Sequence, residues 1–197
     1  MKKGIAFFDF DGTLTKNDTL LEIIRFQKGK LSFSLGFLIC SPILLAYKIG
    51  LISNSTAKQQ VLQYFFGGDA FPVFQSSCDR FAEKILPNLL RHKAMAEIEK
   101  LKGMEIQVVI VSASAENWIK KWADSIEAEL VATRLEIVDQ RITGKFSGKN
   151  CHGREKAERI RAVYDLSAYG RIYCYGDTRG DREMLALGDI SYYKPFR

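Results

Sequence analysis

Two aspartates one residue apart follow directly on a short apolar run near the start of the chain. The run covers residues 4–8, and Asp9, Asp11 and Gly12 come after it. A short apolar run bounded by turn residues is typical of a buried strand in a parallel sheet. Open α/β sheets bind their ligands at the carboxyl ends of the strands. Because two carboxylates there are costly unless a cation pairs with them, the pattern predicts a nucleophile and a partner acid beside a hard metal ion.

The bulk composition sets the class of protein. The chain has 197 residues, a net charge of +6 and a hydrophobic fraction of 47%. These values are ordinary for a soluble globular protein with one core, or with a core and a small inserted domain. The lysines and arginines are scattered, so we expect a solvated basic surface and no nucleic-acid partner. No signal peptide precedes the first strand, and we expect a cytoplasmic location. The sequence does not indicate an oligomeric state.

Apolar runs that alternate with helical patterns indicate the fold. Residues 106–111 and 171–175 read as two further buried strands, which implies a doubly wound parallel α/β sheet. An all-helical block at residues 18–90 interrupts the alternation and is best explained as an inserted cap domain. The catalytic core would then consist of residues 1–17 and 91–197. The helices that we expect cover residues 18–27, 54–66, 71–85, 87–102, 117–126, 154–164 and 182–187, with a hairpin at 135–146.

Four more residues whose side chains could take part in catalysis fall at the ends of these strands or just before one. Ser112 follows the second strand directly, and Asp177 follows the third in the same way. Asp181 lies one helical turn further on, and Lys156 opens the helix before the third strand. Each residue alone is a weak signal. Together, carboxylates, a hydroxyl and a lysine at one edge of a sheet suit a phosphate bound with Mg²⁺.

These residues resemble the four motifs of the haloacid dehalogenase (HAD) superfamily hydrolases. Residues 9–14 match the first motif, Ser112 the second, Lys156 the third and residues 176–185 the fourth. The match spans almost the whole chain, and it implies a HAD-like core. The helical block between the first and second motifs resembles the C1 cap of the phosphoserine-phosphatase-like subgroup, subfamily IB.

The resemblance implies a Mg²⁺-dependent phosphomonoester hydrolase that acts through an aspartyl-phosphate. Asp9 would attack the phosphorus, and Asp11 would protonate the leaving alkoxide and later take a proton from water. Asp9, Asp177 and the backbone carbonyl of Asp11 would hold Mg²⁺. Asp181 would support the water ligands of the metal from nearby.

The same resemblance implies which residues contact the substrate. Ser112 and Lys156 would bind the phosphoryl oxygens, and Lys156 would also offset the repulsion between Asp9 and a phosphate dianion. The full set of substrate-binding residues that we expect is Gly12, Thr13, Asp18, Ser112, Ala113 and Lys156.

Departures from the subgroup bear on the leaving group. Phosphoserine phosphatases have Ser-Gly-Gly in the second motif, where this chain has Ser-Ala-Ser at residues 112–114. Their cap glutamate corresponds to Asp18, and their cap arginine, which meets the substrate carboxylate, aligns with Gln60. An amide cannot bind a carboxylate as a bidentate cation does. Phosphoserine and other small metabolites are therefore alternatives to a lipid phosphomonoester such as phosphatidylglycerophosphate.

Two further alternatives concern the reaction itself. A catalytically silent phosphate-binding module would not require both Asp9 and Asp11, so the intact pair argues against it. A phosphotransferase differs only in how well it excludes water, and the sequence does not separate it from a phosphatase.

Residues 31–52 form a long apolar segment in which Lys48 is the only charge. A single membrane span here would place Asp9 and Lys156 on opposite sides of the bilayer, which would divide the site. Two interpretations remain. The favoured one is a set of buried cap helices; the other is a cap surface that dips into the bilayer interface, as the flanking lysines indicate. The second would suit a lipid phosphate, and the segment resembles the cap of phosphatidylglycerophosphatases of this subgroup.

Overall fold

A five-stranded sheet forms the centre of the computed structural model, which describes residues 3–197. The strand order is β3-β2-β1-β6-β7, and every neighbouring pair is parallel. The predicted doubly wound parallel sheet is therefore confirmed. The strands are β1 (Gly4–Asp9), β2 (Gln107–Ala115), β3 (Glu129–Thr133), β6 (Arg171–Gly176) and β7 (Ile190–Tyr193).

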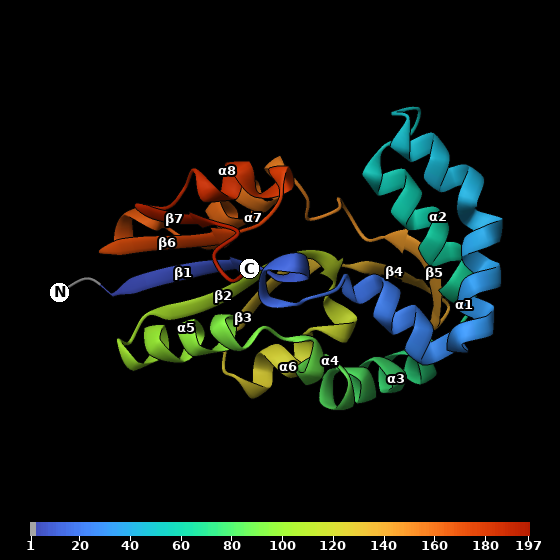
Figure 1. The fold of residues 1–197 in the computed structure, drawn as a ribbon, viewed down its shortest axis with the longest axis horizontal. Coiled ribbons are helices and arrows are strands. Elements are labelled where there is room, and N and C mark those ends of the chain that lie inside the picture. The colour runs from blue at the N-terminus through green and yellow to red at the C-terminus, as the bar shows by residue number, and fades with distance from the viewer. Residues whose placement is uncertain (1–2) are drawn as a thin grey trace.

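Helices cover both faces of this sheet (Figure 1). Alternate residues of β1 point to opposite sides. Ile5 and Phe7 pack with residues of α7 and α8, and Ala6 and Phe8 pack with residues of α5 and α6. Because β1 is buried on both faces, it reads as a continuous apolar run rather than an alternating one. The helices are α5 (His92–Gly103), α6 (Lys120–Ser125), α7 (Arg154–Val163) and α8 (Arg182–Leu185).

The edge strand β3 was not expected from the sequence. It pairs with β2, and the register shifts between Ser112 and Ala115. The strand has five residues, begins with Glu129 and contains only one fully apolar triplet. Such a short run gives little periodicity from which to predict a strand. Short 3-10 or π turns complete the core: η1 (Phe10–Leu14), η2 (Glu116–Trp118), η3 (Leu166–Ala168) and η4 (Arg179–Asp181).

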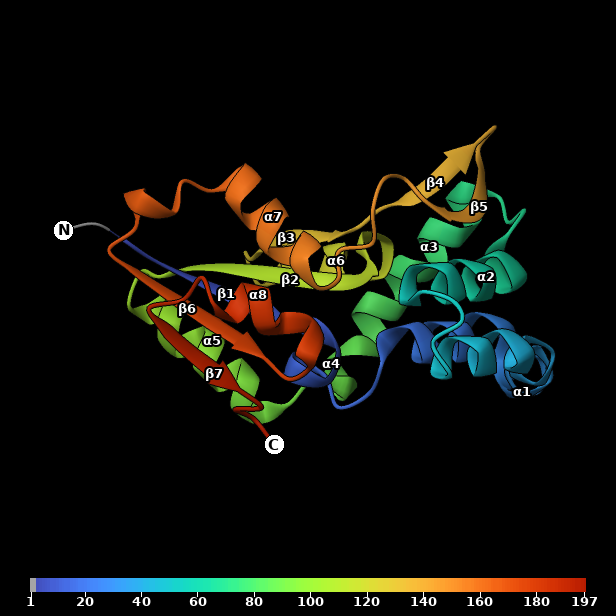
Figure 2. The same ribbon diagram turned by 90° about the horizontal axis from the view of Figure 1, so that it is seen from above.

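The cap lies beyond the carboxyl ends of the strands (Figures 1 and 2). Its longest helix bends at Gly29, where φ is +79°. After the bend, Gly36 faces the second cap helix so closely that a Cβ there would collide with the ring of Phe65. The two helices therefore pack tightly along the second half of the longer one. The cap helices are α1 (Thr19–Lys48), α2 (Asn54–Phe66), α3 (Phe71–Lys84) and α4 (Leu86–Leu89).

The predicted hairpin is present and packs against the cap. It consists of β4 (Leu135–Val138) and β5 (Arg141–Phe146). The backbone amide of Gly68, just after α2, donates to the carbonyl of Ile142 at 2.8 Å, and the amide of Ile142 donates to Asp69 at 3.0 Å. Our division into a cap and a core remains a prediction, and it assigns this hairpin to the core. Residues 1 and 2 of that core lie outside the described residues.

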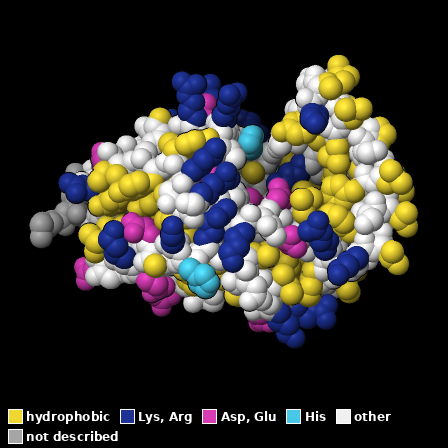
Figure 3. Space-filling view, viewed as in Figure 1, with side chains coloured by type: hydrophobic (Ala, Val, Ile, Leu, Met, Phe, Trp, Pro, Cys, Tyr) yellow, Lys and Arg dark blue, Asp and Glu magenta, His cyan; other side chains and the backbone are white. Residues whose placement is uncertain are grey.

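The interpretation of residues 31–52 as buried helices is wrong for their outer face. Leu31 is 82% exposed and Leu38 is 70% exposed. Within the described residues, α1 is the one helix long and apolar enough to cross a membrane by length and composition alone, and only 11% of its apolar window is buried. Figure 3 shows hydrophobic side chains along the outer edge of the cap and around the hollow between cap and core.

Candidate active site

Three charged side chains meet in the interior at the carboxyl edge of the sheet. Asp9 ends β1, Lys156 lies in the first turn of α7, and Asp181 closes the turn after β6. The ammonium of Lys156 donates to Asp9 Oδ1 at 2.5 Å and to Asp181 Oδ1 at 2.7 Å. All three residues are buried, so these ion pairs are shielded from water. A buried charge of either sign would be costly without its partners.

Burial and the neighbouring charges have opposite effects on the pKa of Asp9 and on the pKa of Lys156. Burial raises the pKa of Asp9 to about 7, against the opposing charge of Lys156. For Lys156, burial acts to lower the pKa, but the charges of Asp9 and Asp181 outweigh it and hold the pKa above its usual range. Lys156 is therefore a permanent cation beside Asp9.

Three carboxylates form a candidate metal site. Asp9, Asp177 and Asp181 each offer an oxygen, and these atoms all lie within 4.8 Å of one another. Oδ1 of Asp177 is buried and has no hydrogen-bond partner among the described residues. A buried carboxylate oxygen without a partner fits a ligand for a hard cation such as Mg²⁺. The carboxylate of Asp11 is not part of this group. The expected contribution of Asp11, through its backbone carbonyl, remains a prediction.

Backbone amides hold Asp181 in place. Its Oδ2 accepts from the amide of Asp177 at 3.1 Å and from the amide and hydroxyl of Thr178, both at 2.9 Å. Thr178 and Asp181 together form a capping box at the start of the turn. Charge and hydrogen bonds keep the pKa of Asp181 low despite its burial, so it stays ionised.

The turn after β1 shapes the floor of the site. Gly12 has φ +83°, and a Cβ there would lie 2.6 Å from Oδ2 of Asp177. Only glycine fits this position without strain. The hydroxyl of the next residue, Thr13, donates to Asp9 Oδ2 at 2.7 Å. Both oxygens of Asp9 are thus oriented, one by Thr13 and the other by Lys156.

Asp11 points away from these groups, toward the cap. Its Oδ1 accepts from the amide and the hydroxyl of Thr19, each at 2.7 Å. Its Oδ2 accepts from the hydroxyl of Ser114 at 2.6 Å. The sequence reasoning missed both partners. Ser114 could have been suspected because it follows the same strand end as Ser112, whereas nothing in the sequence singles out Thr19.

The second predicted motif lies at the same edge as Asp9. Val111 is the partner of Asp9 in the sheet register, and Ser112 follows it. Ser112 is buried, and its Oγ accepts from the amide of Ser114 at 3.0 Å. The carbonyl of Ala113 accepts from the ammonium of Lys58 at 2.9 Å. This last contact joins α2 of the cap to the last residues of β2.

Lys58 is the cap cation that reaches the site, and the sequence reasoning placed Gln60 there instead. Gln60 is exposed. Lys58 opposes the effects of burial and of Asp11, which together raise the pKa of Asp18. The sequence could have indicated Lys58, because it is the only charged residue of α2. Asp18 caps α1 by accepting from the amide of Leu20 at 2.9 Å.

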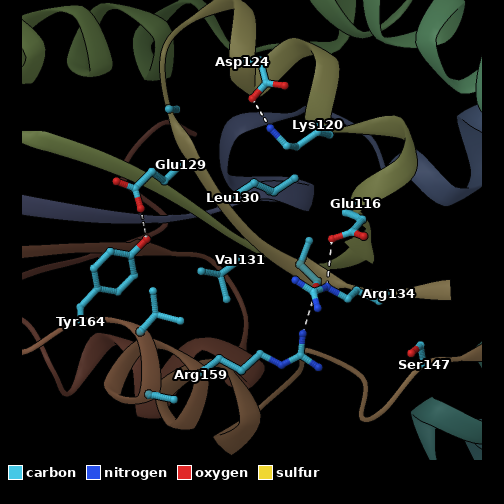
Figure 4. Close-up of a pocket in the computed structure, with 14 residues that line it drawn as sticks. Glu116, Lys120, Asp124, Glu129, Leu130, Val131, Arg134, Ser147, Arg159 and Tyr164 are labelled. Carbon is cyan, nitrogen blue, oxygen red and sulfur yellow. Dashed lines mark hydrogen bonds and ion pairs between the residues drawn. The ribbon is translucent and has the colours of Figure 1, made fainter.

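A large surface cavity lies elsewhere on the described residues. It has a volume of about 630 Å³ and lies along β3, and none of the predicted site residues lines it (Figure 4). Its polar groups are paired with one another: Arg134 with Glu116, and Lys120 with Asp124. The aspartate cluster, with its unpartnered oxygen, is therefore the better candidate site.

Known proteins resemble this chain in sequence and in fold. The chain is similar to Protein CicA of Caulobacter vibrioides, with 35% identity over 195 residues that cover 98% of this chain and 86% of that protein. A similar fold occurs in a protein of unknown function from Bordetella pertussis Tohama I, with a TM-score of 0.83, 17% identity, and coverage of 97% of this chain and 89% of that one. A phospho-aspartyl intermediate analogue of phosphoserine phosphatase matches with a TM-score of 0.69, 18% identity, and coverage of 97% and 86%.

Sequence identities below 20% mean that the solved structures support the fold alone. The family is assigned from the sequence, because the family model of the haloacid dehalogenase-like hydrolases matches residues 6–186. That match runs from the third residue of β1 almost to the end of the core, and it contains every predicted site residue. The chain therefore belongs to the haloacid dehalogenase-like hydrolases, as its motifs predicted.

Proposed function

We propose that this protein is a Mg²⁺-dependent phosphomonoester hydrolase that acts through an aspartyl-phosphate. The observation that carries the proposal is the environment of Asp9. Its carboxylate is buried at a strand end, oriented by Thr13 and Lys156, and lies beside Asp177, whose Oδ1 has no partner among the described residues. A nucleophile held in place next to a free metal ligand is the arrangement that phosphoryl transfer requires.

Two displacements at phosphorus complete the reaction. In the first, an oxygen of Asp9 attacks phosphorus, the bond from phosphorus to the substrate alkoxide breaks, and Asp11 gives that alkoxide its proton. In the second, water attacks the phosphorus of the aspartyl-phosphate and Asp11 takes a proton from it. The products are an alcohol, inorganic phosphate and the original Asp9 carboxylate. Splitting the displacement in this way lowers each barrier.

Charge neutralisation is the second requirement. An anionic nucleophile and a phosphate dianion repel each other, and Lys156 places a permanent cation 2.5 Å from Asp9. Mg²⁺ held by Asp9 and Asp177 would supply further positive charge to the phosphoryl oxygens. The hydroxyl of Ser112, at the neighbouring strand end, would donate to another of these oxygens.

Asp11 must turn for its part of the reaction. In this structure its two oxygens accept hydrogen bonds from Thr19 of the cap and from Ser114 near the end of β2. Protonating a leaving group requires one of these oxygens to face the substrate. A rotation of the Asp11 side chain would exchange a bond to Thr19 or Ser114 for one to the substrate.

Phosphoserine is a second substrate candidate. Lys58 and Asp18 place a cation and an anion on the cap side of the site, and a zwitterionic amino acid carries the complementary pair of charges. Lys58 is a point charge rather than a bidentate guanidinium, and it already donates to Ala113. Recognition of a carboxylate would therefore require Lys58 to give up that bond.

A phosphatase screen tests the proposal. It would include p-nitrophenyl phosphate, phosphoserine, sugar phosphates, nucleotides and a lipid phosphate, each with Mg²⁺ and with EDTA. Wild-type protein should hydrolyse at least one of them only with Mg²⁺, and Asp9→Asn should be inactive with an unchanged circular dichroism spectrum. Activity of Asp9→Asn equal to wild type would refute the nucleophile. Tight phosphate binding without any turnover would favour the silent binding module.

A further inference from the structure

The outer face of α1 carries an apolar stripe after the bend at Gly29. Its members recur at intervals of three, four or seven residues, so they share one side of the helix. Each of them is more than half exposed to solvent. This outer stripe consists of Leu31, Leu35, Leu38, Leu45 and Ile49.

The opposite side of the same helix segment is also apolar, and it packs on α2. The rings of Phe37 and Phe65 lie 5.5 Å apart, and Cys40 is buried in this contact. A helix that is apolar all round is normally covered all round. Here one side is covered by α2, and no described residue covers the outer stripe. Exposed apolar patches of this kind mark an interaction surface.

The charge pattern identifies the partner. Residues 23–68 contain no Asp or Glu, whereas five lysines and arginines fall within them. Lys30 and Lys48 are both exposed and lie at the two ends of the outer stripe. An apolar stripe bounded by cations, with no carboxylate nearby, is complementary to an anionic lipid surface.

A second copy of the chain fits this face less well. Two copies related by a twofold axis would pair their α1 helices in antiparallel or parallel fashion, according to the direction of the axis. Lys30 of one copy would then lie beside Lys48 or Lys30 of the other, and in either case like charges would face each other at both ends. A full membrane span also fits poorly, because α2 runs back along α1 and presents Lys58, Gln59 and Gln63.

A groove is present on the side of α1 that faces α2, opposite the outer stripe. It has a volume of about 190 Å³ and runs between α1 and α2. Asp18 and Lys58 lie at the end near the catalytic turn, since Asp18 precedes the Asp11 partner Thr19, and Lys58 contacts Ala113. Most of the remaining wall is apolar: Leu20, Leu21, Phe37, Leu44, Ala57 and Val61.

We propose that the outer stripe of α1 docks on an anionic lipid bilayer, and that the substrate is a lipid phosphomonoester. Its phosphate lies at Asp9 and its hydrocarbon part lies in the groove between α1 and α2. This inference rests on the proposed phosphatase function for its substrate, but not for the docking. A peripheral enzyme of this kind takes its substrate from the surface on which it sits.

Vesicle binding tests the docking without any turnover. Full-length protein is mixed with sedimentable vesicles of phosphatidylcholine, with or without 30% phosphatidylglycerol, a composition chosen to give a strongly anionic surface. The variant Leu35→Glu/Leu38→Glu should lose at least about tenfold in partitioning to anionic vesicles, as expected when charge replaces buried apolar area. Asp9→Asn should bind like wild type.

A matched control adds the same charge elsewhere. Met104 and Val163 are exposed apolar residues of the core, and Met104→Glu/Val163→Glu should bind vesicles like wild type. Equal loss in both double variants, or wild-type protein that ignores anionic vesicles, overturns the docking. So does a wild-type dimer in light scattering that Leu35→Glu/Leu38→Glu converts to a monomer.

Soluble alkyl phosphates test the groove separately. Below their micellar concentrations, kcat/KM of wild type should rise with chain length from butyl to octyl phosphate, and Leu44→Trp, which fills the groove, should flatten that rise. Phosphatidic acid in vesicles should be hydrolysed by wild type and at least about tenfold more slowly by Leu35→Glu/Leu38→Glu. A preference for phosphoserine with no chain-length dependence overturns the lipid substrate. Absence of turnover on every phosphomonoester, with vesicle binding intact, overturns the proposed function instead.

Discussion

The carboxylate of Asp11 is bound by Thr19 through two hydrogen bonds, one from the backbone amide and one from the hydroxyl, each 2.7 Å long. Asp11 lies in the turn after β1, and Thr19 is the first residue of α1. The other oxygen of Asp11 accepts from Ser114, near the end of β2. Asp11, the proposed acid, therefore also joins the cap to two strand ends of the core. A movement of the cap would change the orientation of the Asp11 carboxyl group, which carries the proton for the leaving group.

The hydroxyl of Thr19 should matter for stability. It donates to Asp11 and accepts from the indole N–H of Trp118 at 3.0 Å. Thr19→Val keeps the shape and removes both bonds, so its free energy of unfolding should fall by about 1.5–3 kcal/mol, as for a lost hydrogen bond to a charged group. Urea unfolding measures the change. Thr19→Ser retains the hydroxyl and should stay within about 1 kcal/mol of wild type; equal losses in the two variants would show that packing alone matters.

Asp11→Asn should discriminate between leaving groups. An alkoxide needs a proton as it departs, whereas p-nitrophenolate does not. For an alkyl phosphate, kcat/KM should therefore fall by about 10²–10⁴, the range for loss of a general acid. For p-nitrophenyl phosphate the loss should be much smaller. Steady-state kinetics with both substrates measures the two ratios, and similar losses would assign Asp11 to structure rather than to proton transfer.

The raised pKa of Asp9 predicts a pH dependence of stability in the metal-free protein. Burial raises this pKa from 3.8 to about 7. A carboxyl with a raised pKa binds its proton more tightly in the folded state, so its contribution to stability is complete below pH 3.8 and is lost as the pH rises to about 7. Asp9→Asn lacks this titration and should gain stability relative to wild type across that window.

Urea unfolding in EDTA between pH 4 and pH 8 measures this difference. Mg²⁺ binds the ionised carboxylate, so it should stabilise wild type more at pH 7 than at pH 5 and should do little for Asp9→Asn. Parallel pH profiles for the two proteins in EDTA would contradict the raised pKa.

Arg197 should weaken metal binding. Its guanidinium contacts Oδ2 of Asp177. The ring of the preceding residue, Phe196, stacks on the ring of Tyr175 with the centroids 5.8 Å apart. A cation on a metal ligand opposes a second cation there. Arg197→Gln should therefore bind Mg²⁺ several-fold more tightly in a calorimetric titration, a modest effect because the arginine is half-exposed and its charge is screened. Lys194→Gln removes a charge from the same tail without touching Asp177, and an equal gain in that variant would attribute the effect to net charge.

Strand-end reasoning predicted where the chemistry would gather, and the reason is geometric. Asp9 ends β1, Ser112 lies in the last half of β2 and Asp177 follows β6, and parallel strands bring their carboxyl ends to one edge. Lys156 could be placed because it opens a helix that returns to that edge. The assignment of functions to these residues remains a prediction that the proposed variants test.

Contacts between the cap and the core could not be predicted in this way. Gln60 aligned with the cap arginine of phosphoserine phosphatases, whereas Lys58 is the side chain of α2 that contacts Ala113, and two helical positions separate the two residues by about 200° around the axis. An error of two residues in an alignment therefore reverses the face of a helix. The partners of Asp11 were missed for a related reason: Thr19 is brought to it by the angle at which α1 leaves the core.

Composition could not tell which side of α1 is covered. The segment 31–52 is apolar on both sides, so hydropathy alone favoured burial. Coverage depends on how many neighbouring elements exist, and α2 reaches one side only. The short strand β3 escaped prediction because five residues give too little periodicity.

The bend at Gly29 gives α1 two independent halves. Before the bend, the helix starts from the Thr19 contact with Asp11, so its course is bound to the reaction centre. After the bend, the backbone takes a direction that the first half does not impose, because a glycine with φ +79° interrupts the helical path. Exchange of the arm beyond residue 29 would therefore alter the proposed docking surface and one wall of the groove together, while the contact between Thr19 and Asp11 stays in place.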